Sequence, residues 1–388
     1  MKMSNRPHIS FTEPFGVYLH IPFCSRKCSY CDFYSEPLSG GIVQDYLTAV
    51  TKEITFYRNL LGKKAIYSLY IGGGTPSLLS ADQLAGLIEL IVTSFSAPLS
   101  GEITLEANPS SLDQNKLKAY QKAGVNRLSL GVQSLIDQEL KTLGRLHSAS
   151  QAIATIELIK DYFVNFNLDL ILAIPGQTVA SWQETLLTAL SFQPPHLSLY
   201  NLQFEQNTLL AQLVEAGELT GVDDKLDAEL YQLALTMLAQ RGYQHYEISN
   251  FAREGAYSSH NTLYWEYRPY LGLGPAAHSF DGNRRFANQP DLKKYLREIA
   301  RNQLPLAEIT RLTPEEKKSE FLFLGLRLRQ GVELARFAEL FHQKLEDVYS
   351  EKLDYLKKMG LIEVSGGYLS LSHKGLFLGN QVFMEFLN

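Results

Sequence analysis

The sequence predicts an α/β protein in which parallel strands form one sheet. Six segments rich in β-branched and aliphatic residues alternate with segments whose apolar residues recur at helical spacing. Repeated strand–helix units of this kind imply parallel strands. Cysteines, glycines and acidic residues fall at or near the carboxyl ends of these strands, where barrel enzymes gather their chemistry. This favours an incomplete (β/α)6 barrel, open on one side, over an open doubly wound sheet.

The predicted strands are short, and each ends in polar, proline or glycine-containing sequence. In chain order they read GVYLHIP from Gly16, YSLYIGGG from Tyr67, EITLEANP from Glu102, RLSLGVQS from Arg127, NLDLILAIP from Asn167 and HLSLYNLQ from His196. Between them, residues 42–61 and 84–91 keep their apolar side chains on one helical face.

Local capping patterns predict where several helices begin and end. A serine followed three residues later by glutamine or glutamate is the capping-box pattern. The pairs are Ser80 with Gln83, Ser111 with Gln114, and Ser181 with Glu184. Glycines that suit helix C-caps are Gly124 and Gly242.

The alternation loosens after the sixth strand. Two amphipathic helices, at 226–238 and 292–299, flank a loop-rich stretch that contains HNTLYW and GLGPAAHSF. From about residue 310 the pattern predicts three helices and a hairpin, a small α+β module of winged-helix character. We therefore expect an N-terminal tail (1–15), a barrel core (16–204), an extension (205–305) and a C-terminal domain (306–388).

The composition and the apolar segments limit which cellular location and which classes of partner are expected. A formal net charge of −5, from 36 basic and 41 acidic residues, argues against nucleic acid as a partner. No apolar run reaches the roughly 18 residues of a membrane-spanning helix, and the N-terminus lacks the apolar core of a signal peptide. With three clustered cysteines, these features predict a reducing cytoplasm. Peripheral association with a membrane and assembly as a homodimer stay open.

All three cysteines lie in one loop after the first strand. Cys24, Cys28 and Cys31 have the spacing C-x3-C-x2-C. A structural zinc site uses four ligands, commonly as two separated pairs, so a fourth would have to come from His20 or a distant residue. A cubane iron–sulfur cluster normally takes four thiolates, and three leave one iron open to an exchangeable ligand. The spacing favours such a cluster over zinc or over three packing cysteines.

Seven motifs carry a family resemblance that runs from about residue 16 to the C-terminus. YLHIPFC, CSYCDF, YIGGGTPS, EANP, GVQS, LGRLH and LDLILAIPGQ resemble the radical S-adenosylmethionine (radical SAM) superfamily, in the HemN-like branch that contains oxygen-independent coproporphyrinogen III oxidase. The resemblance implies a [4Fe-4S] cluster on the three cysteines, with S-adenosylmethionine bound to its fourth iron. It also implies that the C-terminal module is a HemN-type domain.

The resemblance further implies a set of S-adenosylmethionine contacts. They are Tyr18, Tyr30, Gly73, Gly74, Thr75, Glu106, Gln133, Arg145 and Asp169. Bare glycine backbone allows close approach of a ligand, and the planar fork of Arg145 suits a carboxylate. Glu106 would accept from a ribose hydroxyl or an ammonium group, and Asp169 is expected to end its apolar strand. Taken singly, each residue also fits a turn, surface or salt-bridge role.

Two departures separate the chain from the oxidase of this family. Phe33 stands where the oxidase has a fourth cysteine, and only some sixteen residues precede the first strand, where the oxidase has a longer arm. Both argue against decarboxylation of coproporphyrinogen, and no catalytic residue is assigned. The C-x-F pattern that ends at Phe33 also resembles the heme chaperone subgroup of this branch.

The HNTLYW stretch resembles an H-N-x-x-Y-W motif of that subgroup, which implies heme contacts by His260, Asn261, Tyr264 and Trp265. Histidine is a common axial ligand of heme iron, and aromatic rings can wall a macrocycle. Nearby aromatic residues are Tyr257, Tyr267 and Tyr270. The alternative is that His260 only satisfies local backbone groups. His278 is the competing ligand, and lesser candidates are His20, His147, His196 and His245.

Three functions follow from these features. The first is a heme chaperone that binds heme and passes it to an acceptor hemoprotein, with heme attachment covalent or not. The second is an oxygen-independent coproporphyrinogen III oxidase, and the third another radical SAM reaction such as methyl transfer. The C-terminal module is expected to cap the barrel or meet a protein rather than DNA, because Lys352, Lys357 and Lys358 alternate with Glu351 and Asp354.

Overall fold

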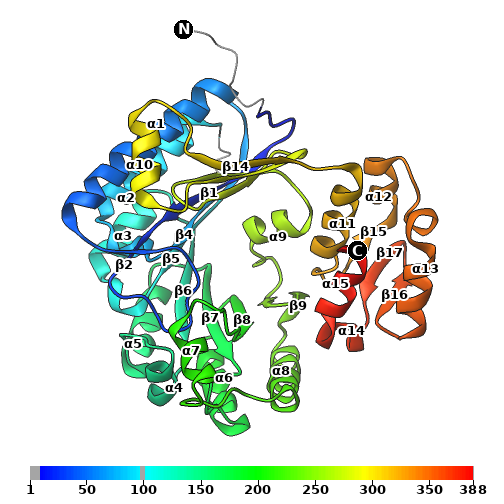
Figure 1. Cartoon of the computed structure of the whole chain (residues 1–388). Helices are drawn as coiled ribbons and strands as arrows, with labels where there is room; N and C mark the ends of the chain where they lie inside the picture. Colours follow the sequence, from blue (N-terminus) through cyan, green and yellow to red (C-terminus); the bar gives the residue numbers. More distant parts are fainter. Residues whose placement is uncertain (1–8, 97–100, 388) are drawn as a thin grey trace.

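A single large sheet carries the fold of the computed structural model, which describes residues 9–96 and 101–387 (Figure 1). Six of its strands pair in parallel, in chain order, and confirm the predicted strands. They are β1 (Phe15–Ile21), β4 (Ile66–Gly73), β5 (Glu102–Ala107), β6 (Arg127–Gln133), β7 (Phe166–Leu172) and β8 (His196–Asn201). Residues 1–8 of the predicted N-terminal tail lie outside the described part.

Helices cover the outer face of these strands (Figure 1). The regular crossovers are α1 (Gly40–Leu61), α2 (Ala81–Ser94), α3 (Gln114–Lys122), α4 (Asp137–Thr142), α5 (Ala149–Lys160) and α6 (Val179–Ser191). Short 3-10 turns, η1 (Pro76–Leu78) and η2 (Pro109–Ser111), follow β4 and β5. Most apolar strand residues are buried between the helices and the barrel interior, and in β6 every residue is buried.

The extension adds strands to both ends of the parallel sheet. At one end β11 (Tyr270–Leu273) pairs in parallel with β1, and β12 (His278–Phe280), β13 (Arg284–Asn288) and β14 (Leu306–Arg311) follow in antiparallel order. At the other end are β10 (Asn250–Ala252) and β9 (Gln244–Glu247). In the described residues the two outermost strands, β14 and β9, do not pair, so the barrel is incomplete as predicted.

Further helices of the extension include α7 (Leu209–Glu215), α8 (Asp224–Ala239) and α10 (Leu292–Ala300). The last two confirm the predicted amphipathic helices. The stretch HNTLYW was expected in a loop, and this expectation was wrong: it forms α9 (Ser259–Trp265). The Ser258 hydroxyl caps this helix by accepting from the backbone N–H of Asn261. A helix of two turns with mixed aromatic and polar residues carries too short a periodic pattern to be recognised in sequence.

Two of the predicted helix starts need correction. The box at Ser80 and Gln83 is present at α2 as predicted. Ser111 instead closes the turn η2 together with Asn108, and Asp113 caps α3. Two capping side chains two residues apart compete for the same helix start, and the one nearer the helix caps it.

The same problem arises at α6. Thr178 is its N-cap and accepts from the backbone N–H of Ser181, so the predicted pair of Ser181 and Glu184 lies inside the helix. The predicted C-caps are confirmed, because Gly124 and Gly242 follow α3 and α8 with φ of 96° and 77°.

The C-terminal residues build a hydrophobic cluster of their own. The predicted helices and hairpin are α11 (Pro314–Gly325), α12 (Leu334–Phe341), α13 (Leu345–Lys358), β16 (Ile362–Ser365) and β17 (Tyr368–Leu371). Elements that the sequence analysis did not anticipate are β15 (Val332–Glu333), α14 (His373–Phe377) and α15 (Gly379–Leu387). Figure 1 shows α9 between the sheet and α11, so this helix lies where barrel and C-terminal domain meet.

The junction is held by specific contacts. The guanidinium of Arg327 lies over the ring of Trp265, 4.3 Å from its centroid. Arg336 donates from Nη2 to the carbonyl oxygen of Glu266 at 2.8 Å. Among residues 9–96 and 101–387, no helix has the length and apolar character needed to cross a membrane.

Candidate functional site

The cysteine loop is closed by a short pair of parallel strands, β2 (Phe23–Cys24) and β3 (Glu36–Pro37). Inside it the backbone N–H of Cys31 donates to the carbonyl oxygen of Cys28 at 3.3 Å. All three thiols line one cavity of about 570 Å3, which we call the cysteine cavity. The structure therefore brings together the three residues that the spacing singled out.

The far side of the loop is anchored to the turn after α4. The backbone N–H and Oγ of Ser29 donate to the carbonyl oxygens of Leu143 and Thr142, at 3.2 and 3.0 Å. A Cβ at Gly144 would lie 2.8 Å from the Ser29 hydroxyl, and φ there is 72°, so only glycine fits. The glycine of the LGRLH motif thus sets how closely the turn approaches the cysteines.

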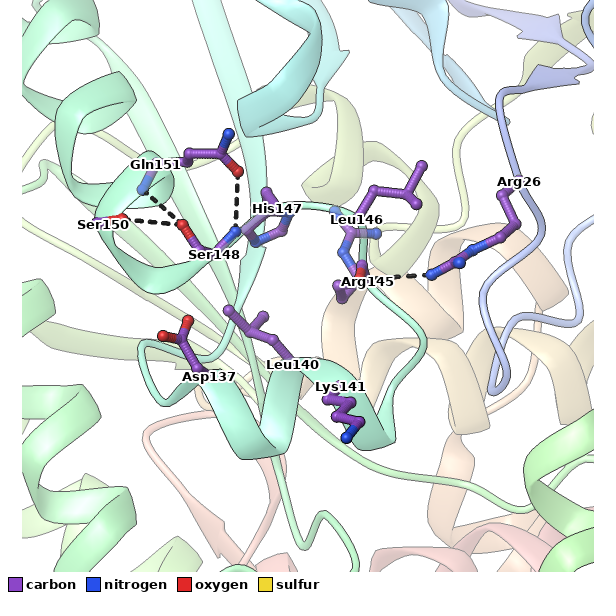
Figure 2. Close-up of a pocket in the computed structure, with 10 residues that line it drawn as sticks. All are labelled: Arg26, Asp137, Leu140, Lys141, Arg145, Leu146, His147, Ser148, Ser150 and Gln151. Carbon is purple, nitrogen blue, oxygen red and sulfur yellow. Dashed lines mark hydrogen bonds between the residues drawn. The ribbon is translucent and has the colours of Figure 1, made fainter.

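The outer side of that turn forms a separate cavity of about 590 Å3, lined by Arg26, Lys141 and the first residues of α5 (Figure 2). Arg26 donates to the carbonyl oxygen of Gly144 at 2.7 Å and reaches that of Arg145 at 3.5 Å. Ser148 and Gln151 cap α5 reciprocally, as Figure 2 shows. These contacts hold the backbone of Arg145 from outside while its guanidinium points inward.

A single zinc ion would need a fourth ligand beside the three thiols. In the part of the chain that the structure describes, no three His, Cys, Asp or Glu side chains converge closely enough to hold one metal ion. His20, the nearby candidate for a fourth zinc ligand, has both ring nitrogens engaged, at 3.0 Å from Tyr18 Oη and from the Tyr34 carbonyl oxygen. Binding of zinc by His20 would therefore require the loss of one of these bonds.

Burial also raises the pKa of Cys31 to about 11. At neutral pH the free thiol therefore keeps its proton, and metal binding has to displace that proton.

Eight of the nine predicted nucleotide contacts line the cysteine cavity. They are Tyr30, Gly73, Gly74, Thr75, Glu106, Gln133, Arg145 and Asp169. The ninth, Tyr18, lines the neighbouring cavity described below. The carboxyl ends of β4 to β7 therefore converge on the cysteine loop, as expected for a barrel.

The glycine run after β4 is required by close approach. A Cβ at Gly72 would lie 2.9 Å from the Glu106 carboxylate, and one at Gly73 would lie 2.5 Å from the His20 ring. A Cβ at Gly74 would meet the Phe23 carbonyl oxygen at 2.6 Å. Any side chain here would push the cysteine loop away from the strand ends, so the run is more than a turn.

Two half-buried carboxylates face the cysteine cavity. Glu106 accepts from Tyr70 Oη at 2.7 Å and from the Gly73 N–H at 3.1 Å, and burial raises its pKa to about 7. Asp169 accepts from Ser129 Oγ at 3.0 Å, and burial raises its pKa as well. A ligand with positive charge or hydroxyl donors would stabilise the ionised forms of both acids.

The expectation that Asp169 ends its strand was wrong. It is the middle residue of β7, which continues to Leu172, and its half-buried side chain faces the cavity. Gln133 does end its strand, at a register shift between β6 and β7, with φ of 69°. A bulge with a left-handed residue re-aims a side chain at some energetic cost, which is typical of functional sites.

Arg145 connects the cysteine loop with the ends of β5 and β6. Its Nη1 lies 3.5 Å from Cys28 Sγ, and Nη2 donates to Asn108 Oδ1 at 2.5 Å and to the Gly131 carbonyl oxygen at 2.8 Å. Its buried Nε has no partner among the described residues. A guanidinium with a free buried donor beside the cysteines can bind a ligand carboxylate.

A second cavity, of about 560 Å3, lies next to the first, and we call it the aromatic cavity. Asp32 and Phe33 line both cavities, so this end of the cysteine loop is their common wall. The other rings come from segments far apart in the chain: Tyr18, Tyr34, Tyr264, Trp265, Tyr267, Tyr270 and Phe280. Trp265 keeps its indole Nε1 buried without a partner in the described structure.

The side chains of the HNTLYW motif lie in two different places, some in this cavity and others outside it. Tyr264 and Trp265 line the aromatic cavity, whereas His260 and Asn261 do not line it. His260 is 1% exposed, its Nδ1 lies 2.8 Å from Ser68 Oγ, and its Nε2 lies 2.7 Å from Tyr264 Oη. Burial lowers its pKa to about 3, so the ring stays neutral.

The other candidate histidines fall into two groups, according to whether they line the aromatic cavity. His147, His196 and His245 lie away from the aromatic cavity and each bonds to a protein group. His20 and His278 line it. No sequence pattern marks which of these imidazoles faces a shared cavity, because the cavity is assembled from distant segments.

Family models match both parts of the chain. The model described as the radical SAM superfamily matches residues 18–189, and the model of the HemN C-terminal domain matches residues 312–378. Among solved structures, coproporphyrinogen III oxidase (HemN) of Escherichia coli superposes with a TM-score of 0.85, covering 96% of this chain and 90% of that one. At 24% identity this likeness shows the fold alone.

Curated relatives match over almost the full length. Heme chaperone HemW of Bacillus subtilis (strain 168) is 38% identical, covering 96% of this chain and 99% of that protein. The Lactococcus lactis heme chaperone HemW is 34% identical, covering 97% and 98%. A mouse protein named radical S-adenosyl methionine domain-containing protein 1, mitochondrial, is 37% identical, covering 96% and 87%. With the three-cysteine loop and the strand-end site, these matches show that the chain belongs to the HemW family of the radical SAM superfamily.

Proposed function

We propose that the protein is a heme chaperone, which binds heme in the aromatic cavity and passes it to an acceptor hemoprotein. The observation that carries the proposal is the aromatic cavity itself, which shares the wall of Asp32 and Phe33 with the cysteine cavity. Its volume of about 560 Å3 is in the range of cofactor sites. The names of the curated HemW relatives support the same function.

The cysteine cavity would hold a [4Fe-4S] cluster and S-adenosylmethionine. Cys24, Cys28 and Cys31 would bind three irons, and the cluster would supply an open iron for the amino acid part of the nucleotide. Arg145 would bind its carboxylate through the free Nε. The remaining predicted contacts are retained for this nucleotide: Tyr30, Gly73, Gly74, Thr75, Glu106, Gln133 and Asp169, with Tyr18 at the border of the two cavities.

The aromatic cavity offers a heme both flat surfaces and groups for its carboxylates. Tyr264 and Trp265 would contact the macrocycle. The propionates would meet Trp265 Nε1, which has no partner in the described structure, and Arg268, which is partly exposed and holds only 3.8 Å ion pairs. Arg285 is less suited, because Glu320 already binds it in bidentate fashion, at 2.9 Å from Nη2. His260 and Asn261 would support heme by fixing α9 behind these contacts.

A second candidate function uses the same two cavities. A coproporphyrinogen in the aromatic cavity would also lie beside the cysteine cavity, which is the arrangement that an oxidase needs. Phe33, in place of the oxidase's fourth cysteine, favours the chaperone. A cytoplasmic location stays a prediction, since one relative is named as mitochondrial.

Two assays with anaerobically purified, cluster-loaded protein test the proposal. In the first, hemin is titrated and the heme absorbance band is followed, and the loaded protein is then mixed with an apo-hemoprotein. We expect saturable binding of one heme per chain and transfer to the acceptor. In the second, coproporphyrinogen III, a reductant and S-adenosylmethionine are supplied. Catalytic formation of protoporphyrinogen would establish the oxidase, and failure to bind hemin would exclude the chaperone.

A further inference from the structure

We infer that His278, rather than His260 of the HNTLYW motif, supplies the axial imidazole to heme iron. The inference rests on the proposed function, because it requires that the aromatic cavity takes heme. It assigns the iron ligand to the rim of the cavity, at the start of β12, and gives His260 a positioning role in α9.

The geometry around His260 leaves no nitrogen for a metal. Nδ1 is bonded to Ser68 and Nε2 to Tyr264, and the ring stacks obliquely near Tyr70 with centroids 5.2 Å apart. Backbone groups of the helix start are held as well, since the N–H groups of Ser259 and His260 donate to the Glu102 carboxylate at 2.8 and 3.2 Å. Iron binding by His260 would break the bond to Tyr264 and expose a fully enclosed ring.

His20, the other imidazole of the cavity besides His278, is closed off in the same way. Its two nitrogens are each 3.0 Å from an oxygen, Tyr18 Oη and the Tyr34 carbonyl. It is 4% exposed, and its ring lies 2.5 Å from the place where a Gly73 Cβ would be. His20 therefore belongs to the framework between the two cavities.

His278 has the opposite surroundings. Its side chain is exposed, lines the aromatic cavity and has no hydrogen-bond or ion-pair partner among residues 9–96 and 101–387. The nitrogens of a neutral imidazole are good iron ligands, and one of them is enough to form an Fe–N bond. Phe280, two residues further along β12, lines the same cavity.

The backbone of His278 is fixed, although its ring is free. A Cβ at Gly272 would lie 2.2 Å from the His278 carbonyl oxygen, so β11 and β12 approach as closely as glycine allows. The Gly272 N–H donates to Ser279 Oγ at 2.8 Å, and the Asn288 N–H donates to the Ala277 carbonyl oxygen at 2.9 Å. A rigid strand that presents one free imidazole at an open rim suits a heme that must bind and later leave.

The test compares full-length wild type with His278→Ala and His260→Ala in a hemin titration followed by absorbance. His373→Ala, an exposed histidine of the C-terminal domain, is the matched control. We expect His278→Ala to shift the heme absorbance band and to weaken binding by about tenfold or more, as loss of one strong interaction does. Free imidazole added to this variant should restore the wild-type spectrum. His260→Ala should keep the wild-type spectrum and lower the melting temperature.

Each result decides between the two histidines. A wild-type spectrum and affinity for His278→Ala would overturn the inference while leaving heme binding intact. Loss of the spectrum on His260→Ala alone would also overturn it. Should His260→Ala fail to fold, His260→Gln takes its place, because its amide can keep polar contacts with Ser68 and Tyr264, and loss of its spectrum would overturn the inference in the same way. If wild type itself binds no hemin, the proposed function fails, and the inference fails with it.

Discussion

The two adjoining cavities differ in how they are built. The cysteine cavity is lined by the cysteine loop and by residues within and after successive strands of one parallel sheet, and its polar groups include acids, basic residues, amides and thiols. The aromatic cavity is lined by residues of β1, the cysteine loop, α9, β11, β12, β13 and α11, and most of these residues carry aromatic rings. Regular strand–helix units place the first, while the packing of the extension and the C-terminal domain creates the second.

The two cavities are therefore held together by different kinds of contact. The backbone pairing of β4 to β7 holds the strand-end groups of the cysteine cavity in place. The aromatic cavity depends on contacts such as that of Arg327 with Trp265, which join elements distant in sequence.

The largest expected effect is loss of the cluster without loss of heme binding. Replacing Cys24, Cys28 and Cys31 together by serine should reduce bound iron and sulfide to background, because no thiolate remains. Heme affinity should change by less than about threefold, because β2 and β3 hold the shared wall without the thiols. Iron and sulfide analysis and a hemin titration measure both. Parallel loss of heme from a folded variant would show that the cavities are not independent.

The second largest expected effect is a pH dependence of the unfolding free energy that comes from two acids, Glu53 and Glu106. Burial raises the pKa of both Glu53 and Glu106 to about 7, although Glu53 accepts only from the structural groups of Gly274, Asn288 and Tyr295. The folded form of each acid binds its proton more tightly than the unfolded chain. Unfolding free energy should therefore fall as pH rises from about 4.5 to 7, by up to about 3 kcal/mol for each acid.

Denaturation with urea across this pH range measures the effect in the apoprotein. Glu106→Gln and Glu53→Gln should each flatten part of the dependence. Nucleotide bound to cluster-loaded protein should flatten only the part that belongs to Glu106, because Glu106 lines the cysteine cavity. An equal response of both acids to the nucleotide would contradict the placement of the site.

A smaller effect is expected from the arginine that crosses between the loop and the strand ends. Arg145→Ala should weaken S-adenosylmethionine binding by about tenfold or more, near 1.4 kcal/mol, since a charged bond to the carboxylate is lost. Lys141→Ala is the matched control, because this exposed lysine of α4 lines only the outer cavity of the same turn. Calorimetric titration of cluster-loaded protein compares them, and equal losses would assign the effect to the turn.

The smallest effect concerns the shared wall. Phe33 is 68% exposed, so Phe33→Ala should leave the melting temperature within about a degree or two. Heme affinity should fall by about threefold to tenfold, because an aromatic contact of the cavity is removed. Iron content should not change. Val164→Ala serves as the control, because Val164 is 94% exposed and lies away from both cavities. Identical heme affinities in the two variants would show that Phe33 does not contact heme.

Elements governed by local interactions could be predicted from the sequence. All six parallel strands, the helices between them and the hairpin of the C-terminal domain were predicted from composition and periodicity. The errors at Ser111 and Ser181 arose because two capping side chains stood near each other, and geometry chose between them. The helix α9 and the parallel strand β11 were missed because the first is short and the second depends on a partner, β1, more than two hundred residues away.

The three thiols and the glycine run could be recognised in the sequence. Metal binding and close approach of the backbone each require particular residue types within a few positions of one another. These constraints allowed the cysteines and glycines of the cysteine cavity to be identified from the sequence alone. Only the tertiary structure decided which ring of the HNTLYW motif is enclosed, which histidine stays free, and that Phe33 divides two cavities. These facts depend on contacts between segments far apart in the chain, where the burial of one side chain is set by partners that its own neighbours in sequence do not reveal.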